Sequence, residues 1–299
     1  MVNNRIKKTL TDRIFDGFNV TLMLVLLVVF AWPLWFVIIA SFSDPNAVLL
    51  GEVLLFPKGF RLNSYEAIIK YKQIWVGYKN SIFYTLFGTV LNMVMSVLFA
   101  YPMSDKTFAA KKPLMVFFMI SMYFSGGLVP TFLLLKNMHI LNTPFVFILV
   151  GAISIYNALI IRSYFQNSIP GELNEAAILD GAGKGMYLVK VVLPLSKPVF
   201  AVVALYYAVG HWNSYTKGLY YIYDQELYPL QNILRELLVS SRMLSDLMQT
   251  DPDLYQEAIE TAQTMKYSVI IAAALPMMIA YPFIQKHFVK GVMVGAVKG

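Results

Sequence analysis

Long apolar runs constrain this chain more than any other feature of its sequence. Six mainly apolar windows have lengths in the range of membrane-spanning helices, which rise ~1.5 Å per residue and cross a hydrocarbon core of about 30 Å. They cover residues 20–42, 81–103, 114–135, 144–165, 199–222 and 267–283. Charged residues make up only 14% of the chain, against roughly a quarter in soluble domains. The sequence therefore predicts an all-α polytopic membrane protein with six transmembrane helices.

The distribution of Lys and Arg predicts the orientation of these spans. Fourteen of the 24 lie in the two tails and in the second–third and fourth–fifth connections, nine lie on the other side, and Lys217 lies inside a span. Of the 17 acidic residues, 6 share the basic-rich side and 11 lie opposite. Because the basic-rich side faces the cytoplasm, we expect both termini and the loop 167–198 there. The net charge of +7 then reflects orientation in a membrane, not binding of nucleic acid.

The other segments are assigned relative to the spans. We expect a basic segment over residues 1–19, a membrane domain over 20–285 and a tail over 286–299. The first apolar run exceeds the apolar part of a signal peptide and lacks a small-residue cleavage site, so it should be a retained span. Outer loops are expected at 43–80 and 224–266, with helical spacing at 62–71 and 230–247. The acidic second loop is either a solvated cap or a docking surface for an external protein.

Residues that could carry catalysis are sparse and scattered. The chain has no Cys, and its three His residues are isolated from one another. The run 180–185 (DGAGKG) superficially suggests a phosphate-binding loop, but Ile178 stands where Gly is required, and Gly185 where Ser or Thr would bind magnesium. Away from the span edges, Lys217 is the one charged residue inside a window. Ion-driven carriers usually keep ionisable groups there, so we expect the driving force to come from another subunit.

The polar loop 167–198 has its own helical pattern. Pro170 suits the first turn of a helix and Glu172 suits the positive end of the helix dipole. Residues 172–179 can form two turns, which Gly181 and Gly183 would end with a positive φ or an unrestricted backbone. A second short helix could follow, built on Val189, Val191, Val192, Leu193 and Leu195.

The order of residues in this loop resembles the EAA loop of ABC importer permeases. The matching residues are Glu175, Ala176, Ala177, Asp180, Gly181, Ala182, Leu193 and Pro194. The resemblance implies a type I ABC importer permease fold with a cytoplasmic coupling helix, where Ala176 and Ala177 leave a low face for close approach. It also implies an ATPase dimer docked at residues 172–183. This chain would then hold no cofactor of its own, since ATP and magnesium belong to the ATPases.

Further segments look like sugar-importing permeases of the maltose-permease type. They are Phe56-Pro57-x-Gly59 with Asn63-x-Tyr65, Trp212-Asn213, and the ending from Lys290 to Gly299. The stretch 125–130 (SGGLVP) looks like a subgroup for longer or acidic oligosaccharides. The family implies a second permease, an extracytoplasmic sugar-binding protein at the outer loops, a carbohydrate substrate, and location in a bacterial cell membrane. It also places Lys298 and Gly299 near the ATPase.

Polar residues within the spans give candidates for a sugar path. Tyr206, Gly210, Asn213 and Lys217 fall within about 60° of one another on a continuous helix. Such faces should point inward, either joining helices or lining a path. Hydroxyl groups of sugars suit Asn and Tyr, and apolar sugar faces suit aromatic rings. The path residues we predict are Asn157, Tyr206, Tyr207, Asn213 and Lys217.

Three other functions remain open at this point. An ABC permease for an amino acid or polyamine would share the loop and the spans. A self-contained carrier or an intramembrane enzyme would instead act as a lone chain. Co-isolation with an ATPase would indicate an ABC permease and would argue against a self-contained carrier or an intramembrane enzyme.

Overall fold

A computed structural model describes residues 9–246 and 265–279. All regular elements in these ranges are helical, and the described residues fall into two units, 9–70 with 237–246 and 265–272, and 71–236 with 273–279. The elements are α1 (Leu10–Ser41), α2 (Pro45–Leu49), α3 (Asn63–Lys70), α4 (Lys72–Ser104), α5 (Lys111–Tyr123), α6 (Leu128–Asn137), α7 (Phe145–Leu149), α8 (Ile155–Ser168), α9 (Gly171–Leu179), α10 (Lys184–Tyr187), a π-helical turn (Leu188–Val192), α11 (Leu193–Leu195), α12 (Lys197–Trp212), α13 (Thr216–Tyr221), a 3-10 turn (Gln225–Leu227), α14 (Leu230–Asp246) and a helix over Met265–Ile279.

The first unit is built on α1, a helix of 32 residues. Thr9 and Asp12 form a capping box at its start, where each side chain accepts a hydrogen bond from the other residue's backbone N–H. At its other end the loop after α2 folds back, and the Trp35 indole donates to the Leu55 carbonyl at 3.0 Å. The segment predicted to be helical at 62–71 forms α3, which confirms that prediction.

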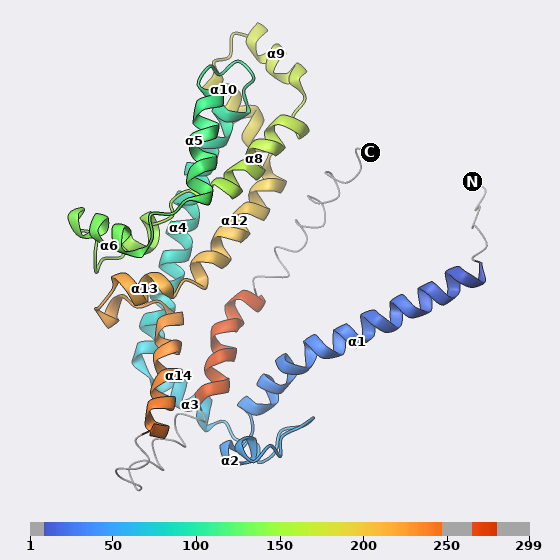
Figure 1. Ribbon diagram of the computed structural model, residues 1–299, viewed down its shortest axis with the longest axis vertical. Helices are drawn as coiled ribbons and strands as arrows, with labels where there is room; N and C mark the ends of the chain where they lie inside the picture. The colour runs from blue at the N-terminus through green and yellow to red at the C-terminus, as the bar shows by residue number, and fades with distance from the viewer. Residues whose placement is uncertain (1–8, 247–264, 280–299) are drawn as a thin grey trace. The chain divides into compact units, whose positions relative to one another are not determined.

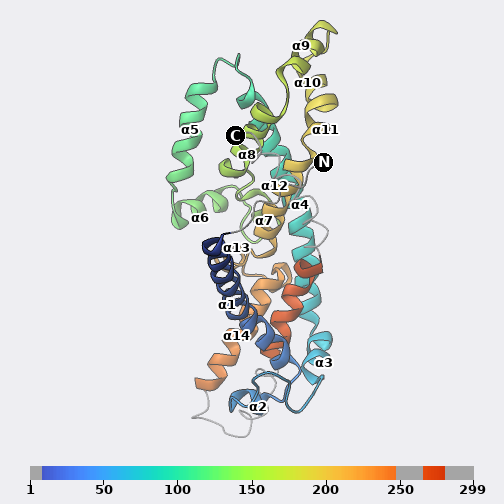
Figure 2. The ribbon, with the colours of Figure 1, turned by 90° about the vertical axis from the view of Figure 1, so that its right-hand side faces the viewer.

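The second unit is organised around α4, which has α8 and α12 beside it (Figures 1 and 2). Buried residues recur along α4 at spacings of three and four, and they include small and polar ones: Ser81, Gly88, Asn92 and Ser96. Gly88 has no room for a side chain, because a Cβ there would lie within 3 Å of the His211 ring. Small residues of this kind let helices approach closely in membranes.

Three of the six predicted spans are broken rather than continuous. The window 114–135 becomes α5 and α6, bent by 112° (Figure 2). The window 144–165 becomes α7 and α8, and the window 199–222 becomes α12 and α13. Gly127 and Gly151 sit at the first two breaks with φ of 87° and 78°, a left-handed backbone that suits glycine. By length and apolarity, α1 and α4 can each cross a membrane as single helices.

Side chains from α4 and α13 satisfy backbone groups that the second break leaves free. Asn92 Nδ2 donates to the Gly151 carbonyl at 2.9 Å, and Lys217 Nζ donates to the carbonyls of Val150 at 2.6 Å and Phe147 at 3.2 Å. Irregular backbone at membrane depth requires such partners. The sixth window is helical over Met265–Ile279, and its last residues lie outside the described ranges.

Candidate functional site

The helix α9 is encoded by the residues on both sides of it. Pro170 precedes it as the N-cap, and Glu172 lies in the first turn. At the other end Gly181 takes a φ of 73°. Its N–H donates to the Ile178 carbonyl at 3.0 Å, and the Ala182 N–H donates to the Ala177 carbonyl at 2.8 Å. This pair of bonds is a Schellman motif, so the order Asp-Gly-Ala is a stop signal for the helix. Gly183, in contrast, has a φ of −69°.

The two alanines of α9 have different surroundings. Ala177 packs against an apolar cluster that contains Ile161, Phe165 and Tyr187, whereas Ala176 is exposed. Beyond them, Ile178 and Leu179 are 63% and 88% exposed. The end of α9 therefore presents an apolar pair that another surface could contact.

The chain continues from α9 into a compact bent segment. Residues 184–195 are helical throughout, with a π-helical turn in the middle, and the path then bends by 80° into α12. Ser196 lies fully buried at the bend, beside Val192, which is also buried. Leu193 and Pro194 form the short α11. The predicted second helix is thus present, and it leads directly into α12 at the centre of the unit.

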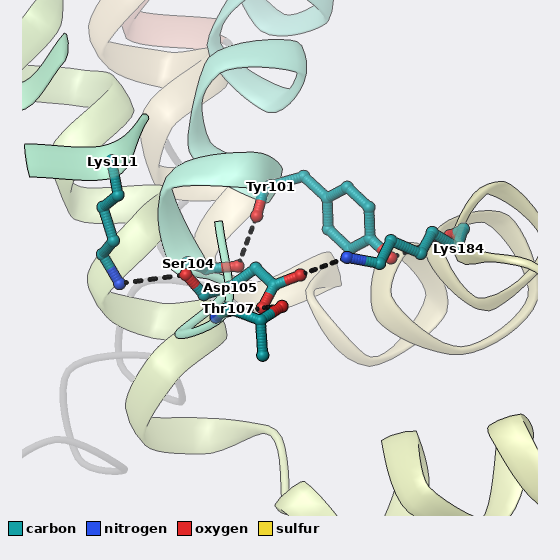
Figure 3. A network of polar contacts seen from close by, with 6 residues as sticks. All are labelled: Tyr101, Ser104, Asp105, Thr107, Lys111 and Lys184. Carbon is teal, nitrogen blue, oxygen red and sulfur yellow. Dashed lines mark hydrogen bonds and ion pairs between the residues drawn. The ribbon is translucent and has the colours of Figure 1, made fainter. Parts of the chain in front are cut away.

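A polar network joins α10 to the C-terminal end of α4 (Figure 3). Lys184 Nζ lies 2.6 Å from Asp105 Oδ2, and the Tyr101 hydroxyl donates to the Lys184 carbonyl at 2.7 Å. Asp105 also accepts hydrogen bonds from the backbone N–H and hydroxyl of Thr107. The Lys184 ammonium first, and the Thr107 donors after it, lower the pKa of Asp105 from 3.8 to about 2. The carboxylate is therefore charged at every physiological pH.

A cleft of about 500 Å³ lies under α9. Its lining combines the inner face of α9, the loop after α4, the end of α8 and the start of α10. Residues on these four parts include Asn174, Glu175, Thr107, Gln166 and Lys184. Both residues of the Asp105–Lys184 ion pair also line the cleft.

The predicted path residues divide into two groups. Tyr206 is 43% exposed, Asn213 is exposed, and a Cβ on Gly210 would meet no atom within 4 Å. These three positions form an open face near the end of α12. Asn157 and Tyr207 are instead buried between helices, where the Tyr207 hydroxyl lies 2.7 Å from the Ser96 hydroxyl and accepts from the Ser154 N–H at 3.1 Å.

The prediction of one continuous helical face from Tyr206 to Lys217 is wrong. It assumed a continuous helix from Tyr206 to Lys217, but α12 ends at Trp212, Asn213 is its C-cap, and Lys217 belongs to α13. Lys217 therefore does not extend the face of Tyr206 and Asn213 by helical spacing, and its ammonium binds the carbonyls at the end of α7. Lys298 and Gly299 lie outside the described residues.

Sequence reasoning missed several residues that connect the helices. Asn92 and Ser96 lie four residues apart on α4 and bind Gly151 and Tyr207; their shared face in an apolar helix was an available signal. Tyr101 and Asp105 also lie four residues apart, but their partner Lys184 follows 79 residues after Asp105. Local spacing gives no signal for that contact.

Comparison with known proteins decides the family. No family model matches the chain. The polygalacturonan/rhamnogalacturonan transport system permease protein YtcP of Bacillus subtilis is 37% identical over 96% of this chain and 99% of its own length. This chain belongs to the permease subunits of sugar ABC importers. The protein LplC of the same organism is 36% identical over 97% of both chains, and the maltodextrin permease MdxG is 26% identical.

A solved structure supports the same assignment. A chain of a bacterial ABC transporter involved in the import of the acidic polysaccharide alginate matches with a TM-score of 0.84 and 30% identity, over 95% of this permease and 99% of that chain. The resemblance to ABC importer permeases, based on the EAA-type loop, and the resemblance to sugar permeases, based on the segments at 56–65, 212–213 and 290–299, are therefore confirmed. The permease is a multi-pass membrane protein with an all-helical ABC permease fold, and its role is transport rather than catalysis.

Proposed function

We propose that this permease forms half of the membrane pore of an ATP-driven importer for oligosaccharides that carry uronic acids. The observation that carries this proposal is the similarity, over nearly the whole chain, to a permease named for polygalacturonan and rhamnogalacturonan. The match to an importer of alginate, which is also acidic, adds to it. A second, homologous permease would complete the pore, and an extracytoplasmic sugar-binding protein would deliver the substrate.

We assign six spans, three of them broken, and a type I importer topology. The spans are α1, α4, α5 with α6, α7 with α8, α12 with α13, and the helix over Met265–Ile279. The excess of Lys and Arg on one side supports cytoplasmic termini and a cytoplasmic α9. The acidic loop 224–266 would then face the binding protein.

In this proposal α9 is the coupling helix that meets the ATPase. Its exposed tip, Ile178 and Leu179, is apolar, and the acidic residues Glu172, Glu175 and Asp180 lie along the same short segment. A partner groove with an apolar floor and basic edges would complement this surface. ATP and magnesium would be bound by the ATPase pair alone.

The mechanism that follows is alternating access. ATP binding closes the ATPase pair and carries both coupling helices with it, and the spans then open outward. Hydrolysis permits the return to the inward-open state. The free energy enters because ATP-bound and ATP-free ATPases prefer different states of the permease pair, and a ligand shifts only an equilibrium whose states it distinguishes.

The coupling role is tested in the complete complex reconstituted in liposomes. The binding protein and the sugar are supplied on the side of the membrane that the outer loops face. Glu175→Lys should lower sugar uptake and sugar-stimulated ATP hydrolysis while the complex still assembles. Lys112→Glu reverses a charge at an exposed position of α5, in the other connection expected on the cytoplasmic side, and should have no effect. Uptake at the wild-type rate by Glu175→Lys would refute the docking role of α9.

The substrate class is tested separately. The cognate binding protein is screened by thermal shift against oligogalacturonates and neutral malto-oligosaccharides, and the stabilising sugars are then used in uptake assays. We expect stabilisation and uptake with the acidic sugars. Uptake of neutral sugars alone would refute the proposed substrate class and leave the family assignment intact.

A further inference from the structure

Lys184 is held at the end of α4 by both its side chain and its main chain. Its ammonium binds the Asp105 carboxylate at 2.6 Å, and its carbonyl accepts a hydrogen bond from Tyr101 at 2.7 Å (Figure 3). Tyr101 and Asp105 are one helical turn apart, so Lys184 is bound at two points along the end of α4. Two such bonds fix the start of α10 in position and in orientation.

Contacts other than the one with Lys184 already hold Asp105 in place. It is the C-cap of α4, and its Oδ1 accepts from the Thr107 N–H at 2.8 Å and from the Thr107 hydroxyl at 2.7 Å. Lys111 donates to the Asp105 carbonyl at 3.2 Å. From α8, Arg162 and Gln166 donate to the carbonyls of Met103 and Ser104. Cations at the last turn also suit the negative end of the helix dipole, so the end of α4 is a rigid anchor.

The remaining support of α9 is less stiff. Ala177 packs against the apolar cluster through a single methyl group, and the cleft of about 500 Å³ separates the rest of the inner face of α9 from the loop after α4. Close-packed regions transmit displacement, whereas an open cleft can narrow and absorb it. Lys184 and Asp105 both line this cleft and are in direct contact.

We propose that Asp105 and Lys184 form a clamp that passes movement of α9 directly to α4. The proposal rests on the coupling role of α9 proposed above. It adds a route that leaves the chain at Lys184, just after the turn that ends α9, whereas α9 is otherwise connected to α8 before it, to α12 through residues 180–196, and to the apolar cluster through Ala177. Both residues are positioning residues and touch neither sugar nor nucleotide.

The route leads from the clamp to the middle of the spans. On α4, Asn92 binds the carbonyl of Gly151 at the break before α8, and Ser96 binds the Tyr207 hydroxyl of α12. A displacement of α4 along or about its axis would therefore move the α7–α8 break and α12 together.

The clamp should matter for coupling and hardly at all for stability. The side chain of Lys184 is 76% exposed and that of Asp105 is 29% exposed, and ion pairs of this kind stabilise proteins weakly. Variants should therefore fold and assemble. A merely structural ion pair would leave the number of sugars imported per ATP unchanged when it is broken.

The test measures sugar uptake and ATP hydrolysis in the reconstituted complex and compares Asp105→Lys, Lys184→Asp and the double swap. We expect each single reversal to lower the ratio of sugar imported to ATP hydrolysed by about fivefold or more, the lower end of usual coupling strengths. The double swap should restore most of the ratio. Tyr101→Phe, which removes one hydroxyl group, should lower the ratio by less.

Controls separate failure of the clamp from failure of the proposed function. Lys190→Asp makes the same charge change on an exposed residue of the adjoining π-helical turn and should keep the wild-type ratio. If Glu175→Lys uncouples transport but both single reversals keep the full ratio, the clamp is wrong and α9 still couples. If the double swap is as impaired as the singles and Asp105→Asn, which keeps an acceptor for Thr107, keeps the full ratio, the two residues do not act as a pair. If Glu175→Lys is also harmless, the coupling role of α9 itself is refuted.

Discussion

The turn after α9 gives the sharpest local prediction, because its backbone requires a glycine. Gly181 has a φ of 73°, and a Cβ built there would meet no atom within 4 Å. Any side chain would therefore fit in the space, and only the backbone conformation would oppose it. Placing a non-glycine residue in the left-handed region costs about 1–2 kcal/mol, which lowers the equilibrium constant for forming the turn by roughly 5- to 30-fold at about 1.4 kcal/mol per factor of ten.

A graded series tests this reasoning. Gly181→Asn should have the mildest effect, since Asn tolerates the left-handed region; Gly181→Ala should be intermediate, and Gly181→Val the most severe. Gly183→Ala is the matched control, because Gly183 has a φ of −69° and its Cβ would also meet no atom within 4 Å. That change should be neutral or stabilise the loop slightly.

The series is assayed by sugar uptake and sugar-stimulated ATP hydrolysis in liposomes, with limited proteolysis of residues 179–184 as a direct report on the turn. Loss of uptake should follow the order of the backbone cost, and protease sensitivity should rise in the same order. If Gly181→Val equals Gly183→Ala in both assays, the Schellman turn does not position α9 for coupling.

Three further predictions concern the second unit and the clamp. Gly88→Ala should lower the yield and melting temperature of the detergent-purified complex, because its Cβ would collide with the His211 ring. Gly210→Ala, whose Cβ would meet no atom within 4 Å, should not change stability. If the two variants melt at the same temperature, α4 and α12 can separate at Gly88. Lys217→Met should cost about 1–3 kcal/mol by leaving the Val150 and Phe147 carbonyls unpaired, whereas Lys136→Met on α6, which is exposed, should melt like wild type. The pKa of Asp105 is lowered from 3.8 to about 2, so the clamp should be complete above about pH 4 and lost only as the pH falls toward 2. The wild-type ratio of sugar to ATP relative to Asp105→Asn should thus stay constant from about pH 5 to 8, and a transition within that range would contradict the assignment.

The sequence predicted the elements whose signals are local. The stop at Asp180-Gly181-Ala182, the helix before it, and the helical spacing of α3 and α14 all depend on residues within a few positions of one another. The membrane class followed from the apolar windows alone. The resemblance to ABC importer permeases depended on eight residues of one loop, and the resemblance to sugar permeases depended on short segments elsewhere in the chain.

The breaks in three spans could not be predicted in the same way. The sequence stays mainly apolar on both sides of Gly127, Gly151 and Asn213. Hydropathy averaged over a window therefore predicts one continuous span across each of these sites. At the α7–α8 break the stabilising groups are distant in sequence: Asn92 and Lys217 supply hydrogen bonds to the backbone carbonyls of Gly151, Val150 and Phe147. The Asp105–Lys184 contact was hidden for the same reason, since its two residues approach only once α4 and α10 have packed.

The polar residues of the spans therefore have two different constraints. Asn92, Tyr207 and Lys217 bind backbone groups at or beside the α7–α8 break, and an unpaired backbone group in a bilayer costs several kcal/mol. A substitution at one of these three residues would leave a backbone group unpaired, so any change of sugar specificity would come with a less stable fold. Tyr206 and Asn213 lie on an open face of α12 and make no such backbone contacts among the described residues through their side chains. Changes of sugar preference between related permeases should accordingly arise at the open face, where a new side chain can alter the path without releasing the broken helices.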